Sequence, residues 1–202
     1  MSISGTDAYA RESRLPPLVV RALAAARTHG FAHSCRPEQG RLLQVLAGGA
    51  KSAIAETGTG CGVGLAWLAT GARAGVRLVS VERDPVRARV AAEVFSDRAE
   101  VEVMVGDWWR IAERAPYDLV VLDGGGVGKI PEDEPADPAR LLTPGGRVVI
   151  DDFTPAAEDP PRHDGRPDLP RLHWLRHPAL RTIEIPLAED LATLVGTRRW
   201  PE

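Results

Sequence analysis

The chain has 202 residues, which suits one domain with a sizeable core and is short for two. Hydrophobic residues make up 44% and charged residues 26%, as in ordinary globular proteins, and no apolar run approaches the roughly 20 residues of a membrane helix. The formal net charge of −3 argues against a surface for nucleic acid or anionic membrane, where a basic excess is expected.

The N-terminus and the cysteines predict a cytoplasmic protein. Arg11, Glu12 and Arg14 precede the first apolar stretch, so residues 1–14 are predicted to be a polar, mobile segment and not a signal peptide. Cys35 and Cys61 form no CxxC pair that would indicate a zinc site or a disulfide framework. We therefore expect a reducing compartment and a single domain over residues 1–202.

Two helices are predicted before the first strand. Residues 15–30 have prolines near their start and end at Gly30. Residues 36–49 have Pro37 near the first turn and end at a glycine pair. Proline near a helix start and glycine just after a helix end are the usual boundary signals.

From residue 52 onward, apolar runs that predict strands alternate with patterns that predict helices. The expected strands are 52–56, 76–82, 101–106, 117–123 and 146–152, and the expected helices are 63–74, 84–95, a short one after Asp107, and 137–142. A polar loop, 154–170, leads to a helix at 171–178 and to a hairpin of strands 180–187 and 191–200. Near-continuous apolar strands alternating with helices predict an α/β fold whose parallel sheet is covered on both faces.

Acidic residues stand at or near the ends of the predicted strands. They are Glu56, Glu82, Asp123, Asp151 and Asp152. Parallel sheets of this kind bind ligands at the carboxyl ends of their strands. The acids are therefore the first candidates for a functional site.

Glycine recurs at alternate positions after the first strand, in AIAETGTGCGVG (53–64). Glycine lets a ligand approach backbone N–H groups closely, and the start of the following helix is electropositive. The spacing fits neither register of the dinucleotide pattern GxGxxG, because Val63 or Leu65 stands where the third glycine is needed. A phosphate-binding P-loop is excluded because no Lys-Ser/Thr pair follows.

This loop, followed by LVSVERDP (78–85), resembles class I S-adenosylmethionine-dependent methyltransferases. Further motifs are similar, in order, to the catechol and caffeoyl-CoA O-methyltransferase group: PEQGRLLQVLA, GD at 106–107, YDLVVLDG, ARLLTPGGRVVIDDF and TIEIPLAEDLATLV. The resemblance covers residues 35–200 and implies a Rossmann-like, seven-stranded, mostly parallel sheet with an antiparallel C-terminal hairpin. It also implies methyl transfer to an oxygen of a small, catechol-like acceptor, and a possible homodimer.

The resemblance further implies which residues bind S-adenosylmethionine. Glu56 suits its ammonium end, Glu82 can accept from both ribose hydroxyls, and Asp107 can accept from the adenine amino group. Alternatively, Glu82 is a solvated acid and Asp107 caps the next helix. The group often has serine where Gly64 stands, and glycine would leave the cofactor's carboxylate to backbone donors. The expected cofactor-binding set is Glu56, Gly58, Thr59, Gly60, Gly62, Glu82, Arg83, Gly106, Asp107, Trp108 and Asp123.

In metal-dependent members of the group, an Asp after the fourth strand and an Asp-Asn or Asp-Asp pair after the fifth hold a divalent cation. Asp123, Asp151 and Asp152 are the corresponding residues, and carboxylate oxygens suit Mg²⁺. Asp152 replaces the usual Asn, and these acids could instead contact the cofactor or form hydrogen bonds without a cation. Asp123 and Lys129 are the candidate catalytic residues, with Lys129 as general base or, alternatively, as an exposed loop lysine.

Two other functions stay open. A metal-independent methyltransferase of the same fold could act on RNA or another polymer, although the acidic net charge and the lack of a basic stripe disfavour nucleic acid. A protein that binds S-adenosylmethionine without turnover is also compatible with the sequence, because the loop DGGGVGK (123–129) departs from the group's pattern by placing its lysine six residues after the Asp.

Overall fold

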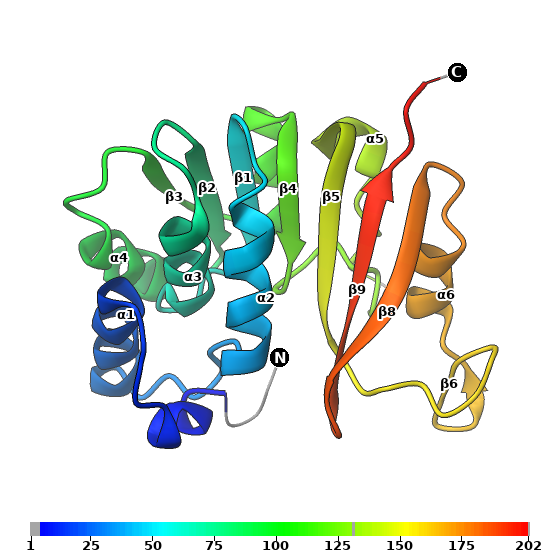
Figure 1. Ribbon diagram of the computed structural model, residues 1–202, viewed down its shortest axis with the longest axis horizontal. Helices are drawn as coiled ribbons and strands as arrows, with labels where there is room; N and C mark the ends of the chain where they lie inside the picture. The colour runs from blue at the N-terminus through cyan, green and yellow to red at the C-terminus, as the bar shows by residue number, and fades with distance from the viewer. Residues whose placement is uncertain (1–4, 131, 202) are drawn as a thin grey trace.

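The computed structural model describes residues 5–130 and 132–201. Its centre is a seven-stranded sheet of order β3-β2-β1-β4-β5-β9-β8 (Figure 1). The strands are β1 (Ala53–Thr57), β2 (Arg77–Glu82), β3 (Val101–Val105), β4 (Tyr117–Leu122), β5 (Leu142–Phe153), β8 (Leu180–Ala188) and β9 (Leu191–Arg198). The first five are parallel, whereas β9 runs antiparallel to both β5 and β8. The predicted Rossmann-like α/β sheet with an antiparallel C-terminal hairpin is confirmed.

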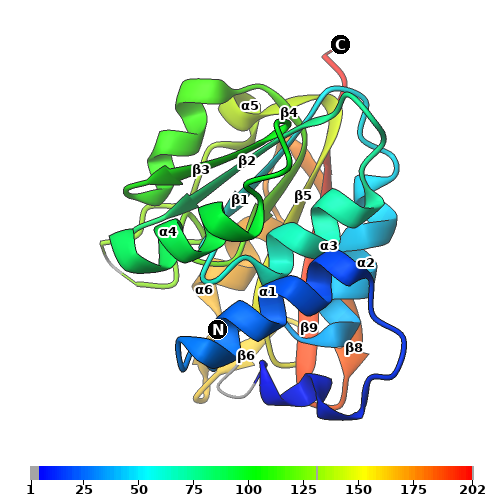
Figure 2. The ribbon, with the colours of Figure 1, turned by 90° about the vertical axis from the view of Figure 1, so that its left-hand side faces the viewer.

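Helices cover both faces of the sheet, as predicted (Figure 2). One face carries α1 (Pro17–Thr28), α2 (Pro37–Ala47), α3 (Val63–Gly71) and α4 (Pro85–Val94). The other carries the 3-10 helix η2 (Trp108–Arg114) and the helices α5 (Pro138–Leu141) and α6 (Leu169–Leu175). Among the described residues, no helix combines the length and apolar content that crossing a membrane requires.

The strand β4 is apolar from Leu119 to Leu122 because both of its faces are buried. In β4, Leu119 and Val121 pack into the core on the α3 side, whereas Val120 and Leu122 pack into the core on the opposite side. Successive strand residues point to opposite faces of a sheet, so a doubly covered strand needs apolar residues at every position. This burial fixes the strands and leaves the loops at their carboxyl ends to form a site.

Residues 5–14 differ from the expected mobile segment. They contain a 3-10 helix, η1 (Asp7–Arg11), whose Tyr9 is 3% exposed. The Tyr9 hydroxyl donates to the Cys35 carbonyl at 2.9 Å and accepts from Trp67 Nε1 at 2.9 Å. A buried aromatic ring with a paired hydroxyl anchors this segment on the core. Residues 1–4 lie outside the described residues.

The predicted polar loop at 154–170 contains a small hairpin, β6 (Arg162–His163) and β7 (Arg166–Pro167). Its turn residues, Asp164 and Gly165, have φ values of +50° and +72°. Positive φ at both central positions is the geometry of the tight hairpin turn that Asp-Gly favours. The Asp-Gly pair was therefore the sequence signal for this element.

Candidate active site

The loop after β1 runs against the loop after β4. Gly58 has a φ of +80°, and a Cβ built there would lie 2.5 Å from the backbone of Gly124. No side chain fits that distance, so close approach of the two loops requires glycine at this point. The same exposed backbone at Gly58 and Gly60 lines the main cavity of the site.

This cavity lies at the carboxyl ends of the parallel strands and has a volume of about 420 Å³. Glu56 and Thr59 line a smaller hollow of about 10 Å³, which shares Gly58 and Asp123 with the main cavity. Gly62 stands just before α3, with a φ of +92°. The predicted cofactor residues on the wall of the main cavity are Gly58, Gly60, Glu82, Arg83, Gly106, Asp107, Trp108 and Asp123.

Glu56 is the buried acid of the smaller hollow. It is 2% exposed, and its Oε2 accepts from Ser80 Oγ at 2.6 Å. The Ser80 hydroxyl also lies 2.6 Å from Thr59 Oγ1. Burial raises the pKa of Glu56 to about 8 against the effect of the Ser80 hydrogen bond, and the nearby Asp123 adds to the rise. A cationic group bound in this hollow would favour the ionised form of Glu56.

Gly64 stands where the resembling group often has serine. In the first turn of α3, a Cβ at this position would collide with Glu56 Oε1. A serine would therefore push the carboxylate away from its Ser80 partner. The Glu56 side chain can therefore keep this position because residue 64 is glycine and not serine.

Glu82 ends β2 and points both of its oxygens at nearby donors. Oε2 accepts from the Gly60 backbone N–H at 2.8 Å, and Oε1 accepts from the Asp84 N–H at 2.9 Å. Arg87 Nη2 lies 3.1 Å from Oε1, and the Glu82 side chain is 7% exposed. Glu82 is therefore not a solvated acid, and its carboxylate ties the glycine loop to β2 while facing the cavity.

Replacing Glu82 by alanine is expected to weaken S-adenosylmethionine binding by about 1.5–3 kcal/mol. This is the contribution of a hydrogen bond to a charged group, and the ribose hydroxyls would lose the carboxylate to which they are expected to donate. Calorimetric titration measures this loss directly. Glu93→Ala removes an exposed acid of α4 and should leave the affinity unchanged. Equal affinities for Glu82→Ala and the unaltered chain would refute the ribose assignment.

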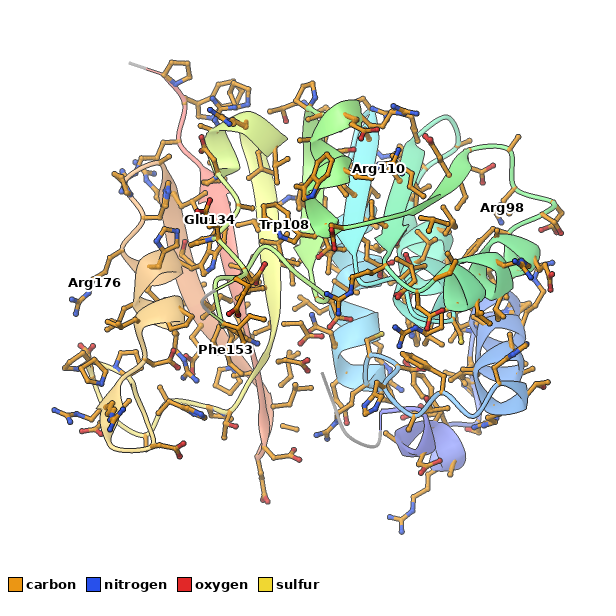
Figure 3. The ribbon with its side chains drawn as sticks, turned by 180° about the vertical axis from the view of Figure 1, so that it is seen from behind. Arg98, Trp108, Arg110, Glu134, Phe153 and Arg176 are labelled. Carbon is orange, nitrogen blue, oxygen red and sulfur yellow. The ribbon has the colours of Figure 1, made fainter. Side chains whose placement is uncertain are left out.

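Trp108 forms one wall of the cavity beside the glycines that follow β4 (Figure 3). A Cβ at Gly125 would lie 2.8 Å from its indole ring, so the ring rests directly on that backbone. The side chain of Asp107 makes no capping hydrogen bond to η2, which removes the alternative role expected for it. Asp107 instead lines the cavity next to Trp108.

Asp123, Asp151 and Asp152 come together, as the sequence predicted for a cation site. One carboxylate oxygen from each lies within 4.8 Å of the others. Asp123 follows β4 and the pair belongs to β5, its parallel neighbour in the sheet. Burial raises the pKa of both Asp123 and Asp151, and the charge of Asp151 raises that of Asp123 further. Three carboxyl groups gathered in this way are a donor set that fits a divalent cation.

Lys129 folds back over the same strand ends. Its Nζ donates to the carbonyl oxygens of Asp151 at 2.9 Å and Asp152 at 3.0 Å. The ammonium also lies 4.4 Å from the centre of the Phe153 ring. Although much of the Lys129 side chain is exposed, desolvation of the ammonium lowers its pKa, against the charges of Asp151 and Asp123. Lys129 is therefore not a free surface lysine.

The main cavity is also lined by residues that the sequence did not assign, among them Phe31, His33 and Arg87. Phe31 and His33 come from the segment between α1 and α2, and Arg87 comes from α4. The guanidinium of Arg87 lies 5.5 Å from the centre of the Phe31 ring. These contacts join segments far apart in the chain, and no motif marks them in advance.

The fold and the cavity together define a class of protein. A parallel sheet with a reversed C-terminal hairpin, a glycine loop after β1 and an acid at the end of β2 are the features of class I S-adenosylmethionine-dependent methyltransferases. Residues 55–153 match a family model described as a methyltransferase domain.

Comparison with known proteins gives the particular family. A protein from Mycobacterium sp. (strain JLS), named as a candidate O-methyltransferase, is 32% identical over 179 residues, covering 74% of this chain and 76% of that protein. One of the same name from Mycobacteroides abscessus is 34% identical over 161 residues, covering 68% and 72%. The chain belongs to this O-methyltransferase family and is an S-adenosylmethionine-dependent O-methyltransferase.

Solved structures share the fold across the whole chain. A cofactor-bound protein from MTB superimposes with a TM-score of 0.75 at 24% identity, covering 100% of this chain and 99% of that one. An O-methyltransferase from Bacillus cereus in complex with SAH superimposes with a TM-score of 0.71 at 21% identity, covering 96% of each chain. Both have the architecture described above.

Proposed function

We propose that this enzyme transfers the methyl group of S-adenosylmethionine to one hydroxyl of a small, catechol-like diol, with a divalent cation held by Asp123, Asp151 and Asp152. The observation that carries the proposal is that Asp123 belongs to both the cofactor cavity and the acidic cluster. An acceptor oxygen bound at that cluster would therefore lie beside the cofactor.

The cofactor residues divide between the main cavity and the smaller hollow. Glu82 and Asp107 would bind the ribose and the adenine, with Trp108 against the base. Glu56, in the smaller hollow, would bind the ammonium end. Burial raises the pKa of Glu56, and an ammonium group bound beside it would lower that pKa again and favour the charged carboxylate that pairs with it.

Methyl transfer is a direct displacement at carbon, so the protein contributes positioning and activation of the oxygen. When bound, S-adenosylmethionine supplies the electrophilic methyl group, and Mg²⁺ would supply the Lewis acidity that lowers the pKa of the acceptor hydroxyl. The Asp123 carboxylate would hold the acceptor oxygen in place. Lys129 would accept the hydroxyl proton at Nζ, since desolvation favours its neutral form.

Release of S-adenosylhomocysteine from the purified enzyme with a panel of vicinal diols tests this function. We expect turnover with diols, none with monophenols, and loss of turnover when a chelator removes the cation. Restored activity on adding Mg²⁺ would complete the pattern. Turnover that survives chelation would identify a metal-independent methyltransferase, and binding of cofactor without any release would identify a non-catalytic protein.

The proposal extends to the setting of the enzyme. Cys35 and Cys61 are both free and buried, which suits a reducing compartment such as the cytoplasm. Homodimerisation is proposed from the family resemblance, and sedimentation of the purified chain measures it. The expected partner is the small-molecule acceptor, and neither nucleic acid nor a membrane is proposed.

A further inference from the structure

The loop that carries Lys129 is held by the carboxylate of Asp133, a residue further along the same loop. Asp133 Oδ1 accepts from the Gly126 N–H at 2.6 Å, and Oδ2 accepts from the N–H groups of Val127 at 3.1 Å and Gly128 at 3.0 Å. Three successive backbone donors thus converge on one acid. Such a cluster of N–H groups is a binding site for negative charge, and here the loop supplies the charge itself.

Further hydrogen bonds hold other backbone groups of the loop. The Val127 carbonyl accepts from Trp174 Nε1 of α6 at 2.9 Å, and the Gly126 carbonyl accepts from the Ala136 N–H at 2.8 Å. The Asp133 carboxylate differs from these because it binds Gly128, the residue directly before Lys129. Asp133 therefore fixes the backbone next to Lys129.

The glycines after Asp123 make such control necessary. Gly124, Gly125 and Gly126 carry no side chain that could pack, and glycine loses the most conformational freedom on ordering. Lys129 stands six residues after Asp123, and its side chain must return to β5 to reach the carbonyls of Asp151 and Asp152. Thr57 Oγ1 donates to the Gly125 carbonyl at 2.9 Å and holds the start of the loop, so the position of Lys129 depends on the contacts at 126–128.

We propose that Asp133 is a positioning residue of the methyl transfer, which clamps the loop at 126–128 so that Lys129 is held over Phe153 at the acidic cluster. The inference rests on the proposed function for its kinetic consequence, because Lys129 is the proposed base. Its structural consequence is the placement of the Lys129 side chain, which does not depend on which methyl acceptor the enzyme uses. Figure 3 labels Phe153 and, separately from it, Glu134, the loop residue next to Asp133.

The structural arm uses the fact that Lys51 and Lys129 are the two lysines of the chain. Labelling lysine with ¹³C at the ε position gives one NMR signal for each. The Phe153 ring should shift the Lys129 ε-protons upfield of those of Lys51, because the ammonium lies 4.4 Å from the ring centre. Asp133→Ala should move the Lys129 signal to the position of Lys51, and Glu134→Ala should leave it in place.

The kinetic arm compares single and double variants. Asp133→Ala should lower kcat on the order of 100-fold, the effect expected when a reacting group is misplaced. In the Lys129→Met background it should cause no further loss, because residues that act through one another are not additive. Asp133→Asn keeps the size of the side chain and one acceptor oxygen, so it should shift the NMR signal and kcat in the same directions by less.

Two outcomes would overturn the proposal. A Lys129 signal that stays in place in both Asp133→Ala and Asp133→Asn would show that another contact positions the lysine. Losses of kcat that add in the double variant would show that Asp133 acts independently of Lys129. If the unaltered enzyme turned over no diol, the proposed function would fail, and the NMR arm would still decide whether Asp133 places Lys129.

Discussion

Lys129→Met is expected to lower kcat by about 10²–10⁴-fold, the range for removing a positioned general base, while leaving S-adenosylmethionine affinity unchanged. Methionine keeps the apolar length of the side chain over Phe153 but cannot accept a proton. The affinity should hold because Lys129 contacts the carbonyls of Asp151 and Asp152 and is not among the residues assigned to the cofactor. Single-turnover release of S-adenosylhomocysteine measures the rate, and calorimetry measures the affinity.

The chain supplies a matched control for this prediction. Lys51 is exposed and directly precedes the sheet, so Lys51→Met should have full activity. Lys129→Arg separates charge from proton transfer, because arginine stays protonated in proteins. An arginine variant as slow as the methionine variant supports a base, whereas recovery of the rate would assign Lys129 an electrostatic role. A fully active Lys129→Met would exclude both.

The sheet was predictable because its signals are local. Burial on both faces makes the strands mostly apolar, and glycine and proline mark the helix ends, so the alternation of strands and helices was enough to predict the α/β class. The N-terminal segment was harder, because its order depends on Tyr9 meeting Cys35 and Trp67, which no local pattern reveals. The β6–β7 hairpin lay within reach, since Asp164 and Gly165 form a known turn pair.

The site residues likewise differ in whether a local sequence pattern or a contact between distant segments reveals them. Glu82 and Asp123 were predictable because the carboxyl ends of parallel strands meet at one edge of the sheet. Phe31, Ser80 and Arg87 were missed because their roles depend on contacts between distant segments. Ser80 could have been found from its place on β2, where it pairs in register with Glu56 and shares its face. The sequence predicted Lys129 as a candidate, but its contacts with β5 required the structure.

Asp123→Asn is expected to lower kcat/KM on diols by about 10³-fold or more, because a cation that acts as a Lewis acid contributes several kcal/mol to the transition state. Asparagine keeps the shape and one ligand oxygen but removes a charge from the cluster. The same change should weaken cation binding, measured as the Mg²⁺-dependent rise in melting temperature. Asp97→Asn, which removes an exposed acid paired with Arg21, should leave both unchanged.

The stability of the enzyme without cation should also depend on pH through this cluster. The folded-state pKa values of Asp123 and Asp151 are raised, so their contribution is fully present below the ordinary Asp pKa, about 3.9, and is lost as pH rises through the raised values. Mg²⁺ competes with protons for these oxygens, so its stabilisation should grow over the same window, reaching about 2.7 kcal/mol at a hundredfold excess over Kd. In Asp123→Asn the pH dependence should flatten and the Mg²⁺ effect should shrink together. Stabilisation by Mg²⁺ that is equal at pH 5 and pH 8, or that survives in the variant, would place the cation elsewhere.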